Sequence, residues 1–309
     1  MQTRPWTSGL LSAVVFTILF DLAGATGAST VTTIPAEATV GPAMAEYVSG
    51  DPAVDAPKLS AYNSAVFDWW YFDAISADLT QGLFLTFNLA LATGVSGGNN
   101  ESIPFASIYA TRGTWEGTGF SWVASPDMES YTITINSTYV SGTHSFESKA
   151  PAHYPCGPVE PGSDLVVAPS VGWINTLPDA DASVSLSVGG TAVDWSGIGY
   201  HDKNWGTEFF GSTFNSWYWG HVRVGPYSLV WFSVPAPGDR QYLSSYVAKD
   251  REVLSASCGP SSVIVRPVGT PYPRGSDPNW PLGYQISIGI GEGETLNVTF
   301  EQTGVIISS

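Results

Sequence analysis

Residues Tyr131–Asn136 read Tyr-Thr-Ile-Thr-Ile-Asn, a regular alternation of apolar and polar side chains. The same period of two recurs at Leu83–Leu89, at Val184–Val188 and at Tyr284–Ile290. Because successive side chains of a β-strand point to opposite faces, each segment predicts a half-buried strand. After the N-terminal segment, no stretch of a dozen residues has helical periodicity. Short strands separated by Gly, Pro, Asn, Asp and Ser predict an all-β fold of antiparallel barrels or sandwiches.

The N-terminus is typical of a secretory signal peptide. A basic start, Met-Gln-Thr-Arg, precedes an apolar run from Leu10 to Leu22, and small residues follow at Ala23–Ala25. A retained membrane anchor is the alternative, but a span needs about 20 apolar residues, and Asp21 interrupts this run. We therefore expect residues 1–25 to be removed, and the protein to be secreted or to reside in a vesicular lumen.

Two features of the sequence agree with passage through the secretory lumen. The two cysteines, Cys156 and Cys258, are expected to form a disulfide there, with two buried free thiols as the alternative. Closing a loop of about 100 residues stabilises a fold by up to roughly 4.7 kcal/mol in the chain-entropy model. Asn100, Asn136 and Asn297 each begin an Asn-x-Ser/Thr sequon and are predicted glycosylation sites.

The composition favours an apolar small-molecule partner. With 27 acidic and 11 basic side chains the net charge is -16, which disfavours binding to nucleic acid or to an anionic membrane. Aromatic residues make up 13% of the chain and include 12 Trp, more ring surface than a core of this size requires. We expect a hydrophobic ligand, no nucleic acid, and no membrane contact after signal cleavage.

The chain is predicted to contain two β domains after the signal peptide. Residues 28–57 lack strong periodicity and predict an arm with one strand near Ser29–Ile34, before an ordered body that begins near Leu59. Prolines crowd residues 154–178, which indicates a domain junction. The predicted division is residues 1–25 for the signal peptide, 26–165 for the N-terminal β domain and 166–309 for the C-terminal β domain.

Three strings are dense in rings and short polar side chains. Phe67–Asp73 reads Phe-Asp-Trp-Trp-Tyr-Phe-Asp, Gly199–Gly206 reads Gly-Tyr-His-Asp-Lys-Asn-Trp-Gly, and Trp217–His221 reads Trp-Tyr-Trp-Gly-His. In a strand, Asp68, Trp70 and Phe72 would share one face, and their neighbours would share the other. The rings could fill a barrel while Asp and Asn bond the backbone of a corner, or they could line a ligand pocket.

Familiar catalytic signatures are missing. We find no Gly-x-Ser-x-Gly, no His-Glu-x-x-His, no phosphate-binding glycine loop and no dinucleotide fingerprint, so no cofactor is predicted. His201 and Asp202 are sequence neighbours that would point apart in a strand. Together with His221 they match no closed metal site, and no metal is predicted. Asp68 and Asp202 remain a possible carboxylate pair of a glycosidase.

The three strings, in this order and spacing, resemble the hydroxyneurosporene synthase or carotenoid 1,2-hydratase (AttH-like) superfamily and its fungal Diels-Alderase and hetero-Diels-Alderase relatives. The resemblance covers about Leu59 to Val234. It implies two lipocalin-like β domains with a ligand pocket in or between them. In the fungal members it implies either decalin formation from a polyene, or hetero-Diels-Alder coupling of a tropolone-derived quinone methide with a macrocyclic terpene.

We therefore expect a cofactor-independent pericyclase. Alternatives are a secreted lipocalin-like carrier, and a polyene hydratase or isomerase in which Asp68 or Asp202 donates a proton. The candidate catalytic residues, mostly hydrogen-bond donors to a substrate carbonyl, are His201, Asn204, Tyr218, His221 and Asp68. The candidate substrate-binding rings are Trp69, Trp70, Phe72, Trp205, Trp217 and Trp219.

Overall fold

The computed structural model describes residues 32–34, 38–50, 54–89, 106–208, 216–238, 240–274, 277 and 279–303. All regular elements within these ranges are β-strands, and they pair in antiparallel sheets, so the predicted all-β class is confirmed. Within the same ranges there is no helix with the length and apolarity needed to cross a lipid bilayer. The predicted signal peptide and Asn100 lie outside the described residues.

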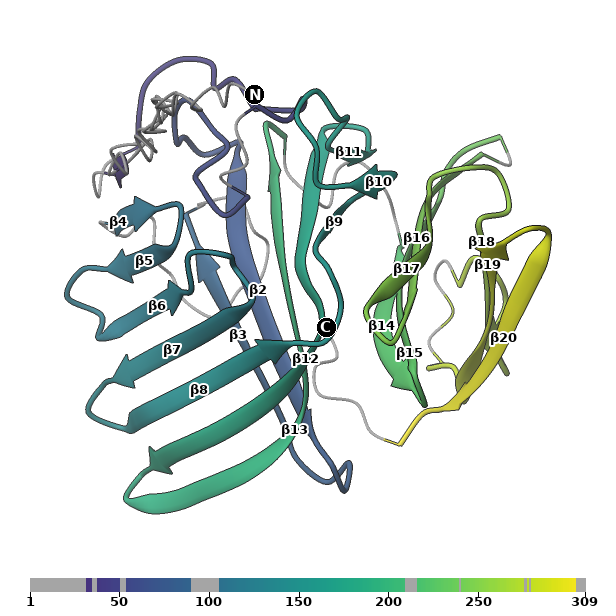
Figure 1. Cartoon of the computed structure of the whole chain (residues 1–309). Coiled ribbons are helices and arrows are strands. Elements are labelled where there is room, and N and C mark those ends of the chain that lie inside the picture. The colour runs from purple at the N-terminus through teal and green to yellow at the C-terminus, as the bar shows by residue number, and fades with distance from the viewer. Residues whose placement is uncertain are drawn as a thin grey trace, which may run out of the picture.

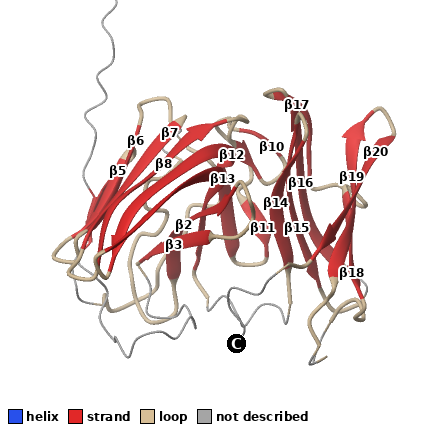
Figure 2. Cartoon of the chain, turned by 90° about the horizontal axis from the view of Figure 1, so that it is seen from below, coloured by secondary structure: helices blue, strands red, loops and turns tan. Residues whose placement is uncertain are grey.

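The first sheet is curled, and its concave face encloses a core rich in rings, including Trp70, Phe72, Trp122 and Phe146 (Figures 1 and 2). Its strand order is β1-β4-β5-β6-β7-β8-β12-β13-β2-β3, with β9 and β11 paired to β12, and β10 paired to β9. The strands are β1 (Thr32–Ile34), β2 (Phe67–Ser76), β3 (Gly82–Asn88), β4 (Ala106–Tyr109), β5 (Arg112–Trp115), β6 (Phe120–Ala124), β7 (Ser130–Asn136), β8 (Val140–Ser148), β9 (His153–Tyr154), β10 (Gly157–Pro158), β11 (Val166–Ala168), β12 (Val171–Val188) and β13 (Thr191–Gly206).

Two smaller sheets lie on one side of the first, at the right in Figure 2. The second sheet packs on the convex face of the first through rings that include Trp173, Tyr200, Phe232 and Tyr246. The third sheet packs on the far side of the second. The second sheet contains β14 (Tyr218–Val224), β15 (Tyr227–Pro235), β16 (Gln241–Lys249) and β17 (Glu252–Ser257), and the third contains β18 (Val263–Val268), β19 (Gly283–Gly291) and β20 (Glu294–Glu301).

Burial changes along the long paired strands β12 and β13. In the half that the second sheet does not cover, buried and exposed residues alternate along β12 from Asp181 to Leu186. In the other half, Val171–Ala180 and Gly199–Gly206 are buried without a break, because both faces of the first sheet are covered there. The polar string of β13 therefore lies inside the protein, at the boundary between two sheets.

The sheets change at a different place from the predicted domain boundary. Residues 154–178 form short strands β9 to β11 and the start of β12, all within the first sheet. The change of sheet falls between β13 and β14. Proline interrupts a hydrogen-bond ladder because it lacks an N–H group, so a proline-rich stretch marks short strands here as readily as it marks a linker.

The segment before Leu59 belongs to the core and is not an arm. The predicted strand near residues 29–34 is seen as β1, which pairs with β4. Val54 is 5% exposed and Asp55 is completely buried on the concave side of the first sheet. This segment lacks periodicity because it covers one end of the curled sheet without forming a long strand.

Candidate active site between the first and second sheets

The polar string of β13 sends alternate side chains to opposite faces of the first sheet. His201 lies opposite Phe72 of β2 and Lys203 lies opposite Trp70, and these side chains contact one another on the concave face. Asp202 lies opposite Tyr71 and faces the second sheet. The predicted separation of His201 and Asp202 is thus confirmed, as is the prediction that Trp70 and Phe72 share a face.

On the concave face, the buried side chains of His201 and Asp55 contact each other through a hydrogen bond. Nε2 of His201 lies 2.9 Å from Oδ2 of Asp55 and Nδ1 lies 2.9 Å from the carbonyl oxygen of Tyr71. The hydroxyl of Tyr131 donates to Asp55 over 2.6 Å. Burial raises the pKa of Asp55, but His201 and Tyr131 more than offset this and leave it below its usual value. Both ring nitrogens of His201 therefore lie within hydrogen-bond distance of an oxygen atom.

A buried ion pair lies two residues further along β13, on the same face of the sheet. Lys203 donates to Asp68, and both side chains are fully buried. The hydroxyl of Tyr62 also donates to Asp68, over 3.0 Å, and Nζ of Lys203 lies 3.3 Å from the ring centroid of Trp70. Burial lowers the pKa of Lys203 to about 8, although Asp68 opposes the shift. The concave face therefore carries two buried pairs, His201 with Asp55 and Lys203 with Asp68.

On the convex face, Asp202 accepts hydrogen bonds from three side chains. These are Nε1 of Trp173 at 2.8 Å, the hydroxyl of Tyr200 at 2.8 Å and Nδ2 of Asn204 at 2.7 Å. Asp202 is 3% exposed, and burial raises its pKa to about 6 in spite of these hydrogen bonds. This carboxyl group can therefore hold or release a proton near neutral pH.

The second sheet contributes a histidine to the same face. Nε2 of His221 on β14 lies 3.0 Å from Oδ1 of Asp73, and the hydroxyl of Tyr71 donates to the other oxygen of Asp73 over 2.8 Å. Burial lowers the pKa of His221, but the charges of Asp73, Asp179 and Asp202 more than offset this and raise it. The imidazolium form of His221 is thus favoured, and it is a strong hydrogen-bond donor.

Aromatic rings surround these groups. The ring of His221 stacks on Tyr200 with centroids 4.2 Å apart, and Trp219 lies 5.3 Å from both Tyr71 and Tyr200. Nε1 of Trp219 donates to the hydroxyl of Tyr200 over 3.2 Å. The side chains of His221 and Asp73 keep 14% and 18% of their surface exposed. We define the candidate active site as this partly open set: Trp69, Tyr71, Asp73, Tyr200, Asp202, Asn204, Trp219 and His221.

The structure divides the predicted site residues among three places. Asn204, His221, Trp69 and Trp219 belong to the candidate active site just defined. Tyr218 and Trp217 line a separate hollow on the other side of β14. The remaining predicted residues lie in or beside the concave core, where their burial is complete; they are His201, Asp68, Trp70, Phe72 and Trp205.

The glycosidase carboxylate pair and the metal site considered from the sequence are both excluded for the same geometric reason. Asp68 and Asp202 extend from opposite faces of one sheet, so they cannot flank one glycosidic bond. His201 and His221 are likewise on opposite faces and cannot share a metal ion. Among the described residues, no group of three or more His, Cys, Asp and Glu side chains is arranged to hold a metal ion.

Sequence reasoning missed the partners that come from distant segments. Asp55 lies in the segment that was predicted to be an arm, and no sequence motif around it marks it as a site residue. Asp73 lies in the Phe67–Asp73 string of β2. Its partner His221 comes from β14, and the sequence does not predict that these two strands pack together. Asp179 was also missed; it accepts hydrogen bonds from Arg223 and Ser228 of the second sheet and so joins the two sheets beside His221.

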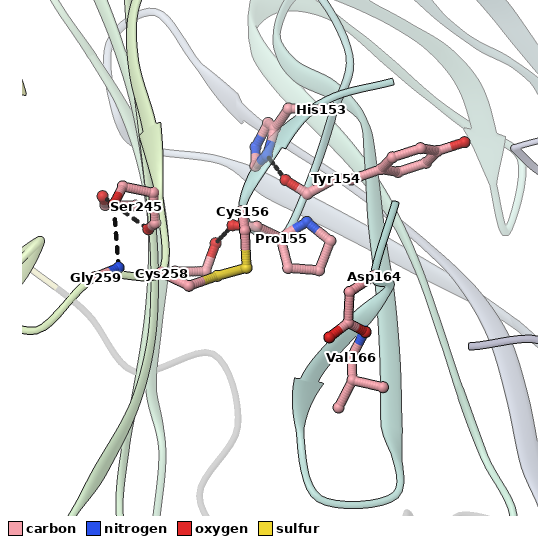
Figure 3. The surroundings of a disulfide bond; sticks show 11 residues. His153, Tyr154, Pro155, Cys156, Asp164, Val166, Ser245, Cys258 and Gly259 are labelled. Carbon is pink, nitrogen blue, oxygen red and sulfur yellow. Dashed lines mark hydrogen bonds between the residues drawn. A yellow bond between two sulfur atoms is a disulfide. The ribbon is translucent and has the colours of Figure 1, made fainter. Parts of the chain in front are cut away.

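The predicted disulfide is present. Cys156 lies between β9 and β10, and Cys258 directly follows β17, so the bond joins the first and second sheets (Figure 3). The hydroxyl of Tyr246 donates to the carbonyl oxygen of Pro151 in the same region. Asn136 and Asn297 are exposed, which leaves both sequons accessible; their glycosylation remains a prediction.

Comparison with known proteins places the chain in a family. The model of the Diels-Alderase-like family matches residues 106–262. The quinolone epoxide rearrangement protein asqO of Emericella nidulans is 32% identical over 301 residues, which cover 87% of this chain and 82% of that protein. The Diels-Alderase cheD of Chaetomium globosum is 25% identical over 238 residues, or 67% of this chain and 56% of that one.

A solved structure supports the fold independently. The crystal structure of CghA with Sch210972 superposes with a TM-score of 0.65 at 16% identity, and covers 88% of this chain and 85% of that one. The lipocalin-like antiparallel architecture expected from the sequence is therefore confirmed. The family match spans β4 to β17 and includes the whole polar string of β13. The chain belongs to the Diels-Alderase-like family.

Proposed function

We propose that this protein is an enzyme of secondary metabolism that catalyses a stereoselective Diels-Alder or hetero-Diels-Alder cycloaddition of a hydrophobic small molecule. The observation that carries the proposal is the cationic donor His221 within a set of aromatic rings, partly open and located between two sheets. Diels-Alderases of several fungi are similar to this chain. A reaction of this type needs shape and polarity more than a nucleophile.

The rings can hold a diene against its dienophile. Holding two reacting groups in the correct geometry is worth roughly 7 to 11 kcal/mol of the barrier. Trp219, Tyr71 and Tyr200 are held by contacts with one another, so little entropy is lost when they clamp an apolar substrate. The shape of the site then decides which face of the diene reacts.

His221 and Asn204 can polarise the substrate. A hydrogen bond to the carbonyl of an enone or a quinone methide lowers the energy of its acceptor orbital and strengthens as charge develops in the transition state. Asp73 holds the His221 imidazolium in place. The proposed substrates are a polyene, a terpene or a quinone methide, and both decalin formation and coupling of a tropolone quinone methide to a macrocyclic terpene fit this chemistry.

Acid-catalysed rearrangement of an epoxide is the second candidate. Two quinolone epoxide rearrangement proteins are 32% and 31% identical to this chain and align over more than 80% of both lengths. Opening an epoxide requires a proton on its oxygen. Asp202, with a pKa of about 6, and protonated His221 are the proton donors that the site offers.

Incubation with candidate substrates tests these functions. The protein is mixed with a reactive polyene enone, with a tropolone quinone-methide precursor plus a macrocyclic triene, and with a quinolone epoxide, and product stereochemistry is compared with the uncatalysed reaction. Stereoselective acceleration of a cycloaddition supports the first candidate, and turnover of the epoxide alone supports the second. Binding without any change in rate or product ratio supports a lipocalin-like carrier. Water addition to the polyene supports a hydratase, as the wider resemblance to carotenoid 1,2-hydratases suggests.

We further propose that the protein matures in the secretory pathway. The disulfide between Cys156 and Cys258 supports this, since disulfides persist in oxidising compartments. N-terminal sequencing of the protein from its native host, together with its mass before and after removal of N-linked glycans, tests the proposal. A mature chain that retains residues 1–25 contradicts it.

A further inference from the structure

A hollow of about 140 Å³ lies on the side of β14 opposite the candidate active site. It is lined by Trp217, Tyr218, Trp219, Trp231, Val265 and Tyr284, of which only Val265 is not aromatic. A cavity of about 150 Å³ with apolar walls accommodates one benzene molecule. The hollow therefore has the capacity for a single six-membered ring.

The walls are built to be flat and rigid. The indole of Trp231 lies against β14 at Gly220, where a Cβ atom would come within 2.3 Å of its ring. Trp231 stacks on Phe300 with centroids 5.7 Å apart, and Tyr218 meets Tyr284 edge-on at 6.2 Å. Trp231 is 8% exposed and Tyr218 is 7% exposed. Trp217 is 45% exposed, so this ring forms the outer wall of the hollow.

The charges near the hollow indicate whether it favours an ammonium group or a neutral aromatic ring. Rings can bind an ammonium group or another aromatic ring. The guanidinium of Arg266 lies 4.3 Å from the ring of Tyr272 and that of Arg274 lies 4.2 Å from the ring of Trp280. The hydroxyl of Tyr218 accepts a hydrogen bond from the backbone N–H of Arg274. Both charges act on Tyr218, a wall of the hollow, and they disfavour a cationic ligand relative to a neutral ring.

Trp219 connects the hollow with the candidate active site. It lines the hollow, and its indole contacts Tyr200 and His221 in the candidate active site. β14 is an edge strand of the second sheet, so the hollow and the candidate active site lie on the two faces of one edge strand. We propose that this hollow is a subsite for a neutral aryl group of the substrate, which makes the substrate class one with a single aromatic ring as substituent. This inference rests on the proposed function.

The test begins with binding, which does not depend on turnover. Titration of the full chain with 4-ethylphenol, followed by saturation-transfer NMR, should give a Kd on the order of 1 mM. Trp217→Ala should weaken this binding at least fivefold. Trp280→Ala is the matched control, because Trp280 is also about half exposed, at 43%, and does not line the hollow; it should leave the Kd unchanged. Phenyltrimethylammonium should bind at least tenfold more weakly than 4-ethylphenol.

Kinetics then separates the subsite from the reaction. With a substrate that carries an aryl group, Trp217→Ala should raise KM, whereas Trp280→Ala should not. With His221→Gln, binding of 4-ethylphenol should persist while kcat falls about 10²- to 10³-fold. Equal Kd values for the two Trp variants, or preferential binding of the ammonium probe, would overturn the subsite and leave the proposed function intact. Unchanged turnover in His221→Gln would instead count against the proposed function while the subsite stands.

Discussion

Nε2 of His201 lies 2.9 Å from Oδ2 of Asp55, although 146 positions separate the two residues in the sequence. Both side chains are fully buried, and Phe72 stacks on the imidazole with centroids 3.8 Å apart. A buried charge without its partner is costly. The pair therefore ties the segment before β2 to β13 of the first sheet.

Asp55→Asn should destabilise the protein by about 3 to 5 kcal/mol, because it removes the carboxylate that pairs with the buried His201 ring. His201→Gln should have a cost of similar size, and the double variant should cost clearly less than the two single costs added together. Urea denaturation measures all three. Glu294→Gln, at an exposed residue of β20, is the control. Additive costs would show that the two side chains are not coupled.

The Asp68–Lys203 pair gives a second, independent prediction. Lys203→Met should destabilise by about 3 to 5 kcal/mol, since it removes the cationic partner of the fully buried Asp68 side chain. Asp68→Asn combined with Lys203→Met should recover most of this loss, because the methionine packs on Trp70 where Nζ now lies. Thermal unfolding of the single and double variants at one pH makes the comparison. A double variant that is less stable than Lys203→Met would contradict the prediction.

The two pairs show what the sequence could and could not provide. Alternation within Phe67–Asp73 and Gly199–Gly206 predicted which side chains share a face, because the strand period depends on local geometry alone. The pairing of Asp55 with His201, and of Asp73 with His221, depends on which distant strands become neighbours. No local pattern encodes that choice.

Strand burial and the side of the strand that each residue faces explain further differences between the predictions from the sequence and the structure. β15 has a nearly continuous apolar run from Leu229 to Val234 because it is covered on both faces, so it lacks the alternation that marks a half-buried strand. Tyr218 and Trp217 were assigned to one site with His221 because they are adjacent in sequence. Tyr218 and Trp219 in fact face different cores on the two sides of β14.

Asp202 should make the free energy of unfolding depend on pH, in the direction set by its raised pKa. Its pKa rises from 3.8 to about 6 in the folded protein, so between about pH 4 and pH 6 the folded state keeps a proton that the unfolded state releases. The free energy of unfolding contributed by Asp202 should therefore fall as pH rises through this window, by up to ~3 kcal/mol.

Asp202→Asn removes this contribution. The difference in unfolding free energy between wild type and Asp202→Asn should change between pH 4 and pH 6 and stay level above it. Asp194→Asn on the same strand is the control, because Asp194 is exposed. Denaturant titrations at several pH values measure the difference. A difference that is constant across the window would show that Asp202 is ionised throughout.

The disulfide should stabilise the contact between the first and second sheets. Its cysteines are 102 positions apart, so replacing both Cys156 and Cys258 by Ser should cost up to ~4.7 kcal/mol in the chain-entropy model. Urea denaturation of the double Ser variant should match that of the reduced wild-type protein. If the oxidised wild type and the double variant unfold at the same urea concentration, the bond adds nothing to stability.

His221 should distinguish a cycloaddition from an acid-catalysed rearrangement. Its pKa is raised above 6.5 because Asp73, Asp179 and Asp202 outweigh the effect of burial, so the protonated donor persists to higher pH than in an ordinary histidine. For a cycloaddition, kcat should be level at low pH and fall only as pH rises through this raised pKa. His221→Gln should lower kcat about 10²- to 10³-fold and remove the alkaline limb. Asp73→Asn should move this limb to lower pH, which a merely structural role would not do.

For an epoxide rearrangement with Asp202 as the acid, kcat should already fall above about pH 6, and Asp202→Asn should abolish it. A pH profile that is identical in wild type and Asp73→Asn would exclude His221 as the group that titrates.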